Sequence, residues 1–206
     1  MVVGPLSLRG MEAVRVRQVK EWGEILTGFE TRNRYEVLDG QDRPLLFAGE
    51  VGGGLGVTLL RLFLKAKRPF VMELRSPDNR VALSLKRPWR WFFSRLEVQD
   101  SSGRHLGSIQ QRFRLLSRRY DIEGPNGELW VTLEGPLFKP WTFFVKRGQE
   151  TVGKIVKRWT GLGKEMFTDA DNFGVEFTPA LRDDAARILV LAATFLIDFV
   201  HFENRD

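Results

Sequence analysis

Residues that could perform covalent chemistry are few in this sequence. It contains no cysteine, which excludes disulfides, thiolate nucleophiles and cysteine metal ligands. Of the two histidines, His105 lies beside a hairpin turn and His201 near the C-terminus, and neither has a nucleophile or metal ligand close in sequence. The glycine-rich "GEVGGGLG" lacks a strand–helix context and a following Lys-Ser/Thr pair, so it does not predict a phosphate-binding loop. We therefore expect no enzyme and no required cofactor.

One acidic segment, "DADNFGVEFTPA", partly matches the spacing of a calcium-binding loop. Such a loop places oxygen ligands at positions 1, 3, 5 and 12, with glycine at position 6. Asp169, Asp171 and Gly174 fit this spacing, but Phe173 and Ala180 stand where ligands are needed. The segment is therefore interpreted as a tight turn before a final strand. The alternative is a weak calcium site formed by Asp169, Asp171 and backbone carbonyls.

Basic and aromatic residues gather in five segments, "LLRLFLKAKRP", "KRPWRWFFSR", "RFRLLSRR", "GPLFKPW" and "KRWTGLGKEMF". Tryptophan beside cations is typical of a membrane interface, where the ring enters the headgroup zone and the base meets anionic lipid. The alternative is that the aromatics pack under one another while the charges are solvated. A nucleic acid would also suit such a surface, but no nucleic-acid-binding motif is present, so this partner is not expected. The candidate residues are Lys86, Arg87, Trp89, Arg90, Trp91, Phe92, Phe93, Arg112, Arg118, Phe138 and Trp141.

The bulk composition is that of one globular domain. The chain has 206 residues, of which 43% are hydrophobic and 28% charged. A net charge of +6 favours an acidic partner, such as anionic lipid headgroups, nucleic acid or an acidic protein. The first residues contain no long apolar core before a small-residue cleavage site, so we expect no signal peptide and a cytoplasmic location.

Five copies of one pattern must position the basic and aromatic segments: an alternating strand, a turn rich in Gly, Pro, Asn or Asp, and a second strand. With a strand near "FGVEF" and one from the N-terminal segment, the strands number about twelve. Closing this sheet into a barrel hides its edges and its apolar face. In an up-and-down antiparallel barrel the tight turns lie at one end. The links between hairpins, which carry the basic and aromatic residues, then lie at the other. The turns centre near Gly40, Asp78, Gly103, Asn126 and Gly148.

The C-terminal "ARILVLAATFLIDFVHFE" is the most apolar stretch of the chain. Residues 188–197 carry no charge and are apolar on every side of a helix, which is typical of a buried one. They rise only about 15 Å, against roughly 30 Å of bilayer hydrocarbon, and Arg187, Asp198 and His201 flank them. We therefore predict a core helix inside the barrel rather than a membrane span. Its candidate core residues are Ile188, Leu189, Leu191, Phe195 and Leu196.

Several motifs together resemble one family. "GKIVKRWTGLGKEMFTDADNFGVEF", followed by "FLIDFVHFE", is similar to the C-terminal half of the phospholipid scramblases, as are "ILTGFETRNRYEVLDGQDRPLLFAGE" and "RPF" further forward. The resemblance covers residues 24–203. It implies the tubby-like fold shared with LURP-one-related proteins, a twelve-stranded barrel around a hydrophobic C-terminal helix. It also implies calcium-stimulated, non-selective movement of phospholipids between leaflets, and phosphoinositide binding as in tubby relatives.

The sequence departs from the animal members of that family in composition. It lacks their proline-rich N-terminal region and their cysteine clusters, so palmitoylation is impossible. "VGGGLGVTLLRLFLKAK" replaces their cysteine-rich loop, and Ala180 stands where they carry an acid in the calcium segment. The compact, cysteine-free form indicates a bacterial relative.

These observations predict a single, mainly β domain over residues 1–206, a closed antiparallel barrel of about twelve strands. It would comprise a variable N-terminal lead at 1–20, an insertion loop at 50–68 and the buried central helix at 183–203. The expected function is a scramblase-family, membrane-associated phospholipid-binding protein, cytoplasmic and peripheral at the inner face of the membrane, with lipid scrambling as an inherited activity. The alternative is a soluble intracellular binding module whose basic surface meets a protein or another anionic partner.

Overall fold

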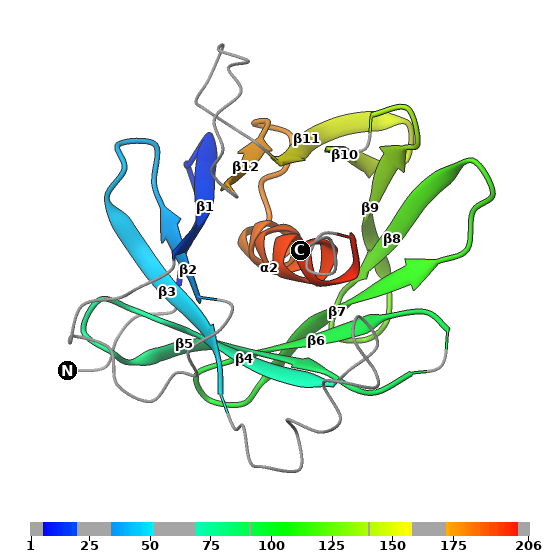
Figure 1. Ribbon diagram of the computed structural model, residues 1–206. Coiled ribbons are helices and arrows are strands. Elements are labelled where there is room, and N and C mark those ends of the chain that lie inside the picture. Colours follow the sequence, from blue (N-terminus) through cyan, green and yellow to red (C-terminus); the bar gives the residue numbers. More distant parts are fainter. Residues whose placement is uncertain are drawn as a thin grey trace.

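A closed antiparallel barrel surrounds one helix, α2 (Asp184–His201), in the part of the chain that the structure describes (Figure 1). The mainly β, helix-filled barrel predicted from the hairpin pattern is confirmed. The structure is a computed structural model and describes residues 6–19, 34–51, 69–90, 92–139, 141–157 and 172–201.

The strands follow one another around the barrel in chain order from β2 to β12, and β1 closes the barrel by pairing with both β2 and β12. The closing pairs join Val16 to Phe173 on one side and to Val37 on the other. The strand bounds are β1 (Ala13–Val19), β2 (Arg34–Leu38), β3 (Pro44–Glu50), β4 (Phe70–Arg75), β5 (Val81–Arg87), β6 (Arg95–Asp100), β7 (His105–Arg112), β8 (Ser117–Glu123), β9 (Leu129–Pro136), β10 (Thr142–Arg147), β11 (Glu150–Lys157) and β12 (Asn172–Phe177).

Alternation along each strand sets which side chains enter the core. In β4, Phe70, Met72 and Leu74 are buried, whereas the intervening Val71 and Glu73 are less buried and face outward. The strand predicted within the N-terminal lead is β1, so residues 13–19 of that lead belong to the barrel. Of the predicted insertion at 50–68, only residues 50 and 51 lie inside the described ranges.

The five hairpins share a bulge beside the turn, and four of them share one turn design. In each, the register shifts by one residue beside the turn because the second strand carries an extra residue, a β-bulge that strengthens the local twist. In four of them the fourth turn residue has a positive φ, namely Asp42, Asn79, Gly103 and Gly127. Glycine adopts this conformation without steric cost, and Asn and Asp tolerate it better than other residues. Local sequence therefore fixes both the position and the shape of these turns.

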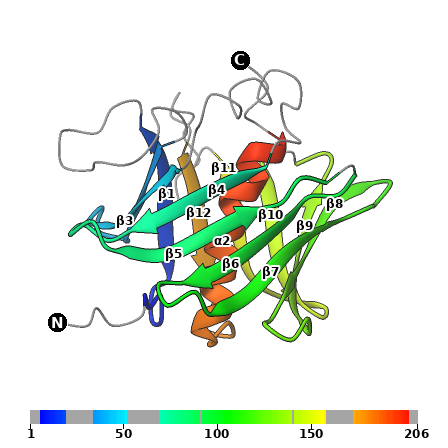
Figure 2. The same cartoon turned by 90° about the horizontal axis from the view of Figure 1, so that it is seen from below.

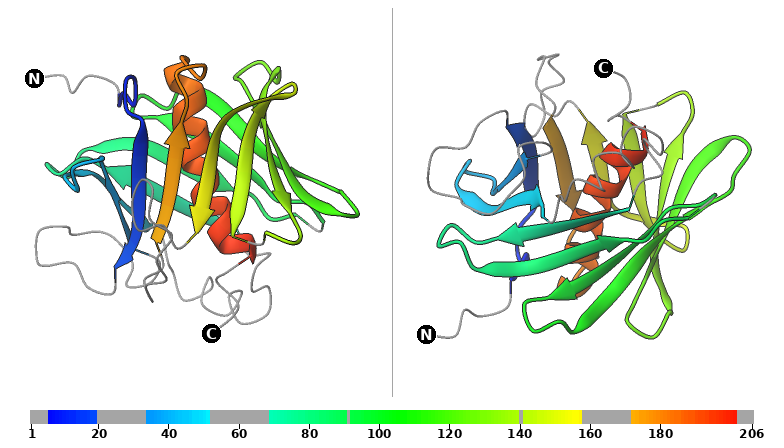
Figure 3. Two further views of the ribbon diagram at one scale, coloured as in Figure 1. Left: turned by 90° about the horizontal axis from the view of Figure 1, so that it is seen from above. Right: turned by 60° about the horizontal axis from the view of Figure 1, so that its bottom comes forward.

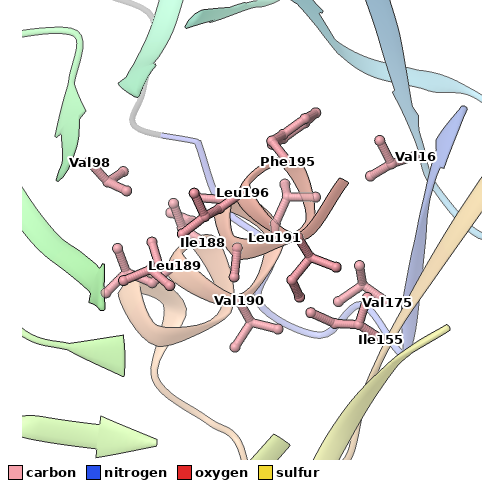
Figure 4. Close-up of a cluster of buried hydrophobic side chains, with 14 of the residues drawn as sticks. Val16, Val98, Ile155, Val175, Ile188, Leu189, Val190, Leu191, Phe195 and Leu196 are labelled. Atoms are coloured by element: carbon pink, nitrogen blue, oxygen red, sulfur yellow. The ribbon is translucent and has the colours of Figure 1, made fainter. Parts of the chain in front are cut away.

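Helix α2 runs obliquely through the barrel from the end with the tight turns to the end with the links (Figures 2 and 3). Its side chains point in several directions toward Val16, Val98, Ile155 and Val175 of the surrounding strands (Figure 4). The strand wall comes close to the helix at Gly107 of β7, where an added Cβ would clash with the carbonyl of Glu123 and with the side chain of Leu189. Ile188, Leu189, Leu191, Phe195 and Leu196 are all at most 6% exposed.

The start of α2 is fixed to the N-terminal segment. Asp183 Oδ1 accepts a hydrogen bond from the backbone N–H of Ala186, as a helix cap does. Asp184 Oδ1 accepts one from the N–H of Leu8 at 2.7 Å. The buried Arg187 guanidinium donates to the carbonyls of Leu181, Leu8 and Met11. This arrangement ties the beginning of the chain to the base of its last helix.

Within the described ranges, no helix combines the length and the apolar character needed to cross a bilayer.

Candidate functional site

Three links between hairpins lie next to one another at the end of the barrel where α2 finishes. Strands β5 to β10 are consecutive neighbours, so the β5–β6, β7–β8 and β9–β10 links follow one another around half of the barrel. Stacking of Phe70, at the start of β4, on Phe199 places this end of the strands beside the C-terminal end of α2. The described residues of these links, 88–90, 92–94, 113–116, 137–139 and 141, are called the link rim below.

Most of the exposed large apolar side chains in the described part of the chain belong to the link rim. The exposed fractions in this group range from 40% for Trp89 to 85% for Phe92. Outside the rim, only Val71 and Leu129 belong to the same class of described residues. Clustered apolar exposure of this kind marks an interaction site rather than ordinary surface. The exposed rim residues are Trp89, Phe92, Phe93, Phe113, Leu115, Leu116, Leu137 and Phe138.

Six of the side chains predicted for this site are exposed at or beside the link rim. The structure places Lys86, Trp89, Arg90, Phe92, Phe93 and Phe138 there. Trp91 lies outside the described residues. Trp141 is half-buried and packs against the hydrophobic core.

Two predicted cations serve the barrel itself. Arg87 is 4% exposed, donates to Ser94 Oγ at 2.8 Å and lies over the ring of Phe70, so its charge does not face outward. Arg118 lies 4.5 Å from the ring centroid of Phe143 and donates to the carbonyl of Lys139.

Arg112 faces the outer wall instead. Its guanidinium pairs with Asp121 and Glu123, each at 2.8 Å. Of the cations expected for the surface, Lys86 and Arg90 are therefore the exposed ones that remain available.

Sequence reasoning missed several rim residues. Phe113, Arg114, Leu115 and Leu116 form the whole β7–β8 link, and Leu137 and Lys139 flank Phe138 in the β9–β10 link. The signal was present, because "FRLL" interrupts the strand alternation with consecutive bulky apolar residues.

The charge of the link rim has one sign. Its described residues include Arg90, Arg114 and Lys139, all exposed, and no aspartate or glutamate. A surface of this kind attracts anions and can be desolvated without burying a carboxylate.

Buried polar contacts from β2 and β11 hold the end of α2 at the link end of the barrel. Asp198 accepts hydrogen bonds from the Tyr35 hydroxyl at 2.7 Å and from Lys157 Nζ at 3.1 Å. Lys157 also lies over the ring of Phe173. The side chains of Tyr35, Lys157 and Asp198 are all buried, so this ion pair is shielded from solvent.

A second contact at the same end joins the Tyr120 hydroxyl to His201 Nε2 at 2.8 Å. Burial raises the pKa of the Tyr120 hydroxyl, which keeps it protonated. Asp198 and His201 thus fix the helix where it reaches the link end of the barrel.

The opposite end carries a cleft of about 520 Å³ between the β4–β5 and β6–β7 turns and the start of α2. Its two arginines, Arg80 and Arg104, form ion pairs with Asp78 and Asp100 of their own turns. Charge at this end is therefore largely compensated locally.

The candidate calcium ligands Asp169 and Asp171 lie outside the described residues. Among the residues that are described, no group of three histidine or acidic side chains could hold a metal ion. The weak calcium site stays a prediction.

The fold and this end of the molecule define a closed, helix-filled β-barrel with a basic and apolar rim. A family model described as Scramblase matches residues 6–204. The chain therefore belongs to the phospholipid scramblase family, as its motifs indicated.

Individual relatives agree with the family model. The chain is 32% identical over 210 residues to phospholipid scramblase 2 of Bos taurus, covering 95% of this chain and 70% of the relative. It is 30% identical over 211 residues to human phospholipid scramblase 1, covering 96% and 65%. A phospholipid scramblase family protein of Schizosaccharomyces pombe is 26% identical over 181 residues, covering 83% and 47%.

This chain thus spans from about half to 70% of the length of these relatives. No solved structure matches the chain. The bacterial origin expected from its compact form stays a prediction.

Proposed function

We propose that this protein binds phospholipid at anionic membrane surfaces through the link rim, and that it carries the phospholipid scrambling activity for which its relatives are named. The observation that supports this most directly is the set of eight exposed apolar side chains interspersed with three exposed cations at one end of the barrel. We place the protein at the cytoplasmic face of the membrane, where anionic lipids concentrate.

The apolar and the basic residues of the link rim contribute two different favourable free energies to membrane attachment. A fully buried Leu or Phe side chain gains roughly 1.5–3 kcal/mol, and a basic residue near an anionic surface contributes about 1 kcal/mol. Either term alone gives weak, reversible attachment, whereas two signals together give stable attachment. Apolar exposure at the rim favours a membrane over a purely charged partner, such as an acidic protein surface.

The barrel interior is an unsuitable path for a lipid headgroup. The inward face of the strands is apolar and packs directly on α2, and Leu189, Leu191 and Phe195 have no exposed surface. A polar headgroup moving through this core would lose its hydration without compensation. We therefore assign any effect on lipid movement to the contact between the link rim and the bilayer.

Liposome flotation tests the proposal. The wild-type chain should float with vesicles that contain phosphatidylserine and much less with phosphatidylcholine alone. A triple variant, Phe92→Ser, Leu115→Ser and Phe138→Ser, should lose flotation. Leu129→Ser, at an exposed apolar site outside the rim, should keep it. Absence of charge-dependent flotation by the wild type, or full flotation by the triple variant, would refute the proposal.

A fluorescent-lipid assay on the same vesicles, with and without calcium, tests scrambling separately. We expect the wild type to expose inner-leaflet lipid to a membrane-impermeant quencher faster than the triple variant does. Equal rates with the wild type, the triple variant and protein-free vesicles would remove scrambling from the proposal and leave membrane binding.

A further inference from the structure

Each of the three links presents its apolar residues at its apex. In the β5–β6 link, Phe92 is far more exposed than its neighbours Trp89 and Phe93. The β7–β8 link exposes Leu115 and Leu116 by 80% and 78%. In the β9–β10 link, Phe138 is 82% exposed. The described apices of these three links are therefore largely hydrocarbon.

Hydrogen bonds hold the first apex in a defined position. The carbonyl of Ser94 accepts a hydrogen bond from the N–H of Gln111 at 2.8 Å, and the Gln111 side chain accepts one in return from the N–H of Ser94. These bonds fix the base of the first link to the end of β7. The rings of Phe93 and Phe113 then approach to 6.4 Å and join the first link to the second.

The third apex is held in the same way. Consecutive turns, closed by Lys139 N–H to the Pro136 carbonyl and by Thr142 N–H to the Lys139 carbonyl, set the position of Phe138. Arg118 of β8 donates to that same Lys139 carbonyl. The first link thus contacts the second, and the third is tied to the strand that follows the second, so their apolar apices are held as one prearranged surface.

The cations lie where they can stay at the headgroups while the apices go deeper. Arg114 stands between Phe113 and Leu115, and Lys139 follows Phe138 directly. Long basic side chains can lay their aliphatic stems along apolar surroundings and keep the charge in a polar layer. Amphipathic helices with the same mixture of basic and bulky apolar residues bury their apolar face roughly 5–10 Å into the boundary between headgroups and acyl chains, and we expect a similar depth for these links.

Resting on the proposed membrane binding, we infer that the apices around Phe92, Leu115 and Phe138 penetrate among the acyl chains, so that the protein selects loosely packed anionic bilayers. A rigid set of bulky groups needs free area between headgroups. At equal surface charge, binding is therefore stronger where lipid packing is loose, as with unsaturated chains or high curvature. The partner is the bilayer itself, and the property that regulates binding is its packing.

Depth can be measured directly because the chain contains no cysteine, so a single introduced cysteine carries a unique label. Leu115→Cys and Phe138→Cys would each receive an environment-sensitive fluorophore, with Leu129→Cys as the matched control. Vesicles would carry a quencher at the headgroup or in mid-chain. Labels at 115 and 138 should be quenched by the mid-chain probe, and the label at 129 by neither.

Selectivity for packing is measured by co-sedimentation with vesicles of equal phosphatidylserine content and different diameter. We expect binding to small vesicles to exceed binding to large ones by about tenfold, the equivalent of about 1.4 kcal/mol. Phe92→Ser with Phe138→Ser should bring this ratio toward one, whereas Arg114→Gln should weaken binding to both sizes equally.

The outcomes separate this inference from the proposed function. Binding with quenching only from the headgroup, or without dependence on vesicle size, would overturn penetration and leave the proposed membrane binding intact. Absence of binding to any anionic vesicle would overturn both.

Discussion

The two ends of the barrel connect their antiparallel strands with loops of different composition. Both must reverse antiparallel strands. At the turn end this is done with local polar contacts: Asp39 Oδ1 accepts the N–H groups of Gln41 and Arg43, while its other oxygen pairs with the Arg43 side chain. At the link end, the chain reverses with Phe92 and Phe138 facing outward.

This difference shows which loop residues the fold needs to connect its strands and which it does not need. The turn end demonstrates that tight polar loops suffice to close these strands. Exposed phenylalanine and leucine at the link end add nothing to closure and cost solubility. Their concentration at the link end, against the single exposed Leu129 beside the described turns, therefore points to a function, which we assign to membrane contact.

The largest predicted effect on stability concerns the buried ion pair between Lys157 and Asp198 at the link end of the barrel. Asp198→Ala removes the carboxylate that the buried Lys157 ammonium faces, and we expect a loss of roughly 3–5 kcal/mol in the free energy of unfolding. Asp198→Leu combined with Lys157→Met should recover much of this loss. Urea unfolding followed by tryptophan fluorescence measures both variants. A change below 1 kcal/mol in Asp198→Ala would show that the pair is not important for holding the helix end.

At the turn end the corresponding anchor is Arg187, which donates to three backbone carbonyls. Arg187→Met leaves these carbonyls with fewer donors, and we expect a loss of about 2–3 kcal/mol. Hydrogen exchange should show the earliest opening at residues 6–11, because two of the three carbonyls belong to Leu8 and Met11. Unchanged protection there would mean that other contacts hold this segment.

Changing a turn residue with a positive φ should have a smaller effect on the free energy of unfolding. Gly103→Ala forces a side chain into a left-handed conformation at φ 81° and should cost about 1 kcal/mol. Ser101→Ala in the same exposed turn is the matched control, for which we expect a change within about 0.5 kcal/mol. Thermal unfolding of the two variants compares them, and equal melting temperatures would contradict the proposed strain.

Turn-end carboxylates also predict an acid response. Hydrogen bonds from the Ser102 hydroxyl and from backbone N–H groups lower the pKa of Asp100. Its contribution to stability is thus present above its ordinary pKa of about 3.9 and is lost as the pH falls through the lowered value. Asp100→Asn keeps an acceptor but does not titrate, so its stability should fall less steeply with acid. Identical acid profiles would exclude a role for Asp100.

The smallest effect is predicted for the link rim itself. Phe138→Ser and Leu115→Ser change exposed side chains, so each should alter the free energy of unfolding by no more than about 0.5 kcal/mol. The same substitutions are expected to abolish membrane flotation when combined with Phe92→Ser. A large loss of stability in either single variant would mean that the rim is part of the fold and would weaken the comparison between the two ends.

Features encoded locally could be predicted from sequence. Alternation in "FVMELR" and the residues of each turn identified the strands and hairpins, and the uncharged stretch before Asp198 identified the core helix. Which side chains face inward at the ends of the strands was harder to predict. Arg87 continues the inward alternation of Leu83 and Leu85, but its charge had suggested an outward position.

The extent of the exposed rim could not be predicted for a physical reason. Whether Leu115 or Phe138 is covered depends on the three-dimensional course of neighbouring links, which no short-range pattern records. Sequence placed basic and aromatic residues at one end. The contacts that join the links, such as Phe93 with Phe113, needed the structure.

The position of α2 in the chain has a consequence for biosynthesis. All described strands are synthesised before the helix that fills the barrel. The backbone N–H of Leu8 cannot form its hydrogen bond until Asp184, 176 positions later in the chain, has been synthesised. Long-range pairings of this kind slow folding and leave apolar surface open in the meantime. During translation the barrel lining therefore has nothing to pack against until α2 leaves the ribosome. A nascent chain stalled before residue 184 should bind chaperones that the released protein does not.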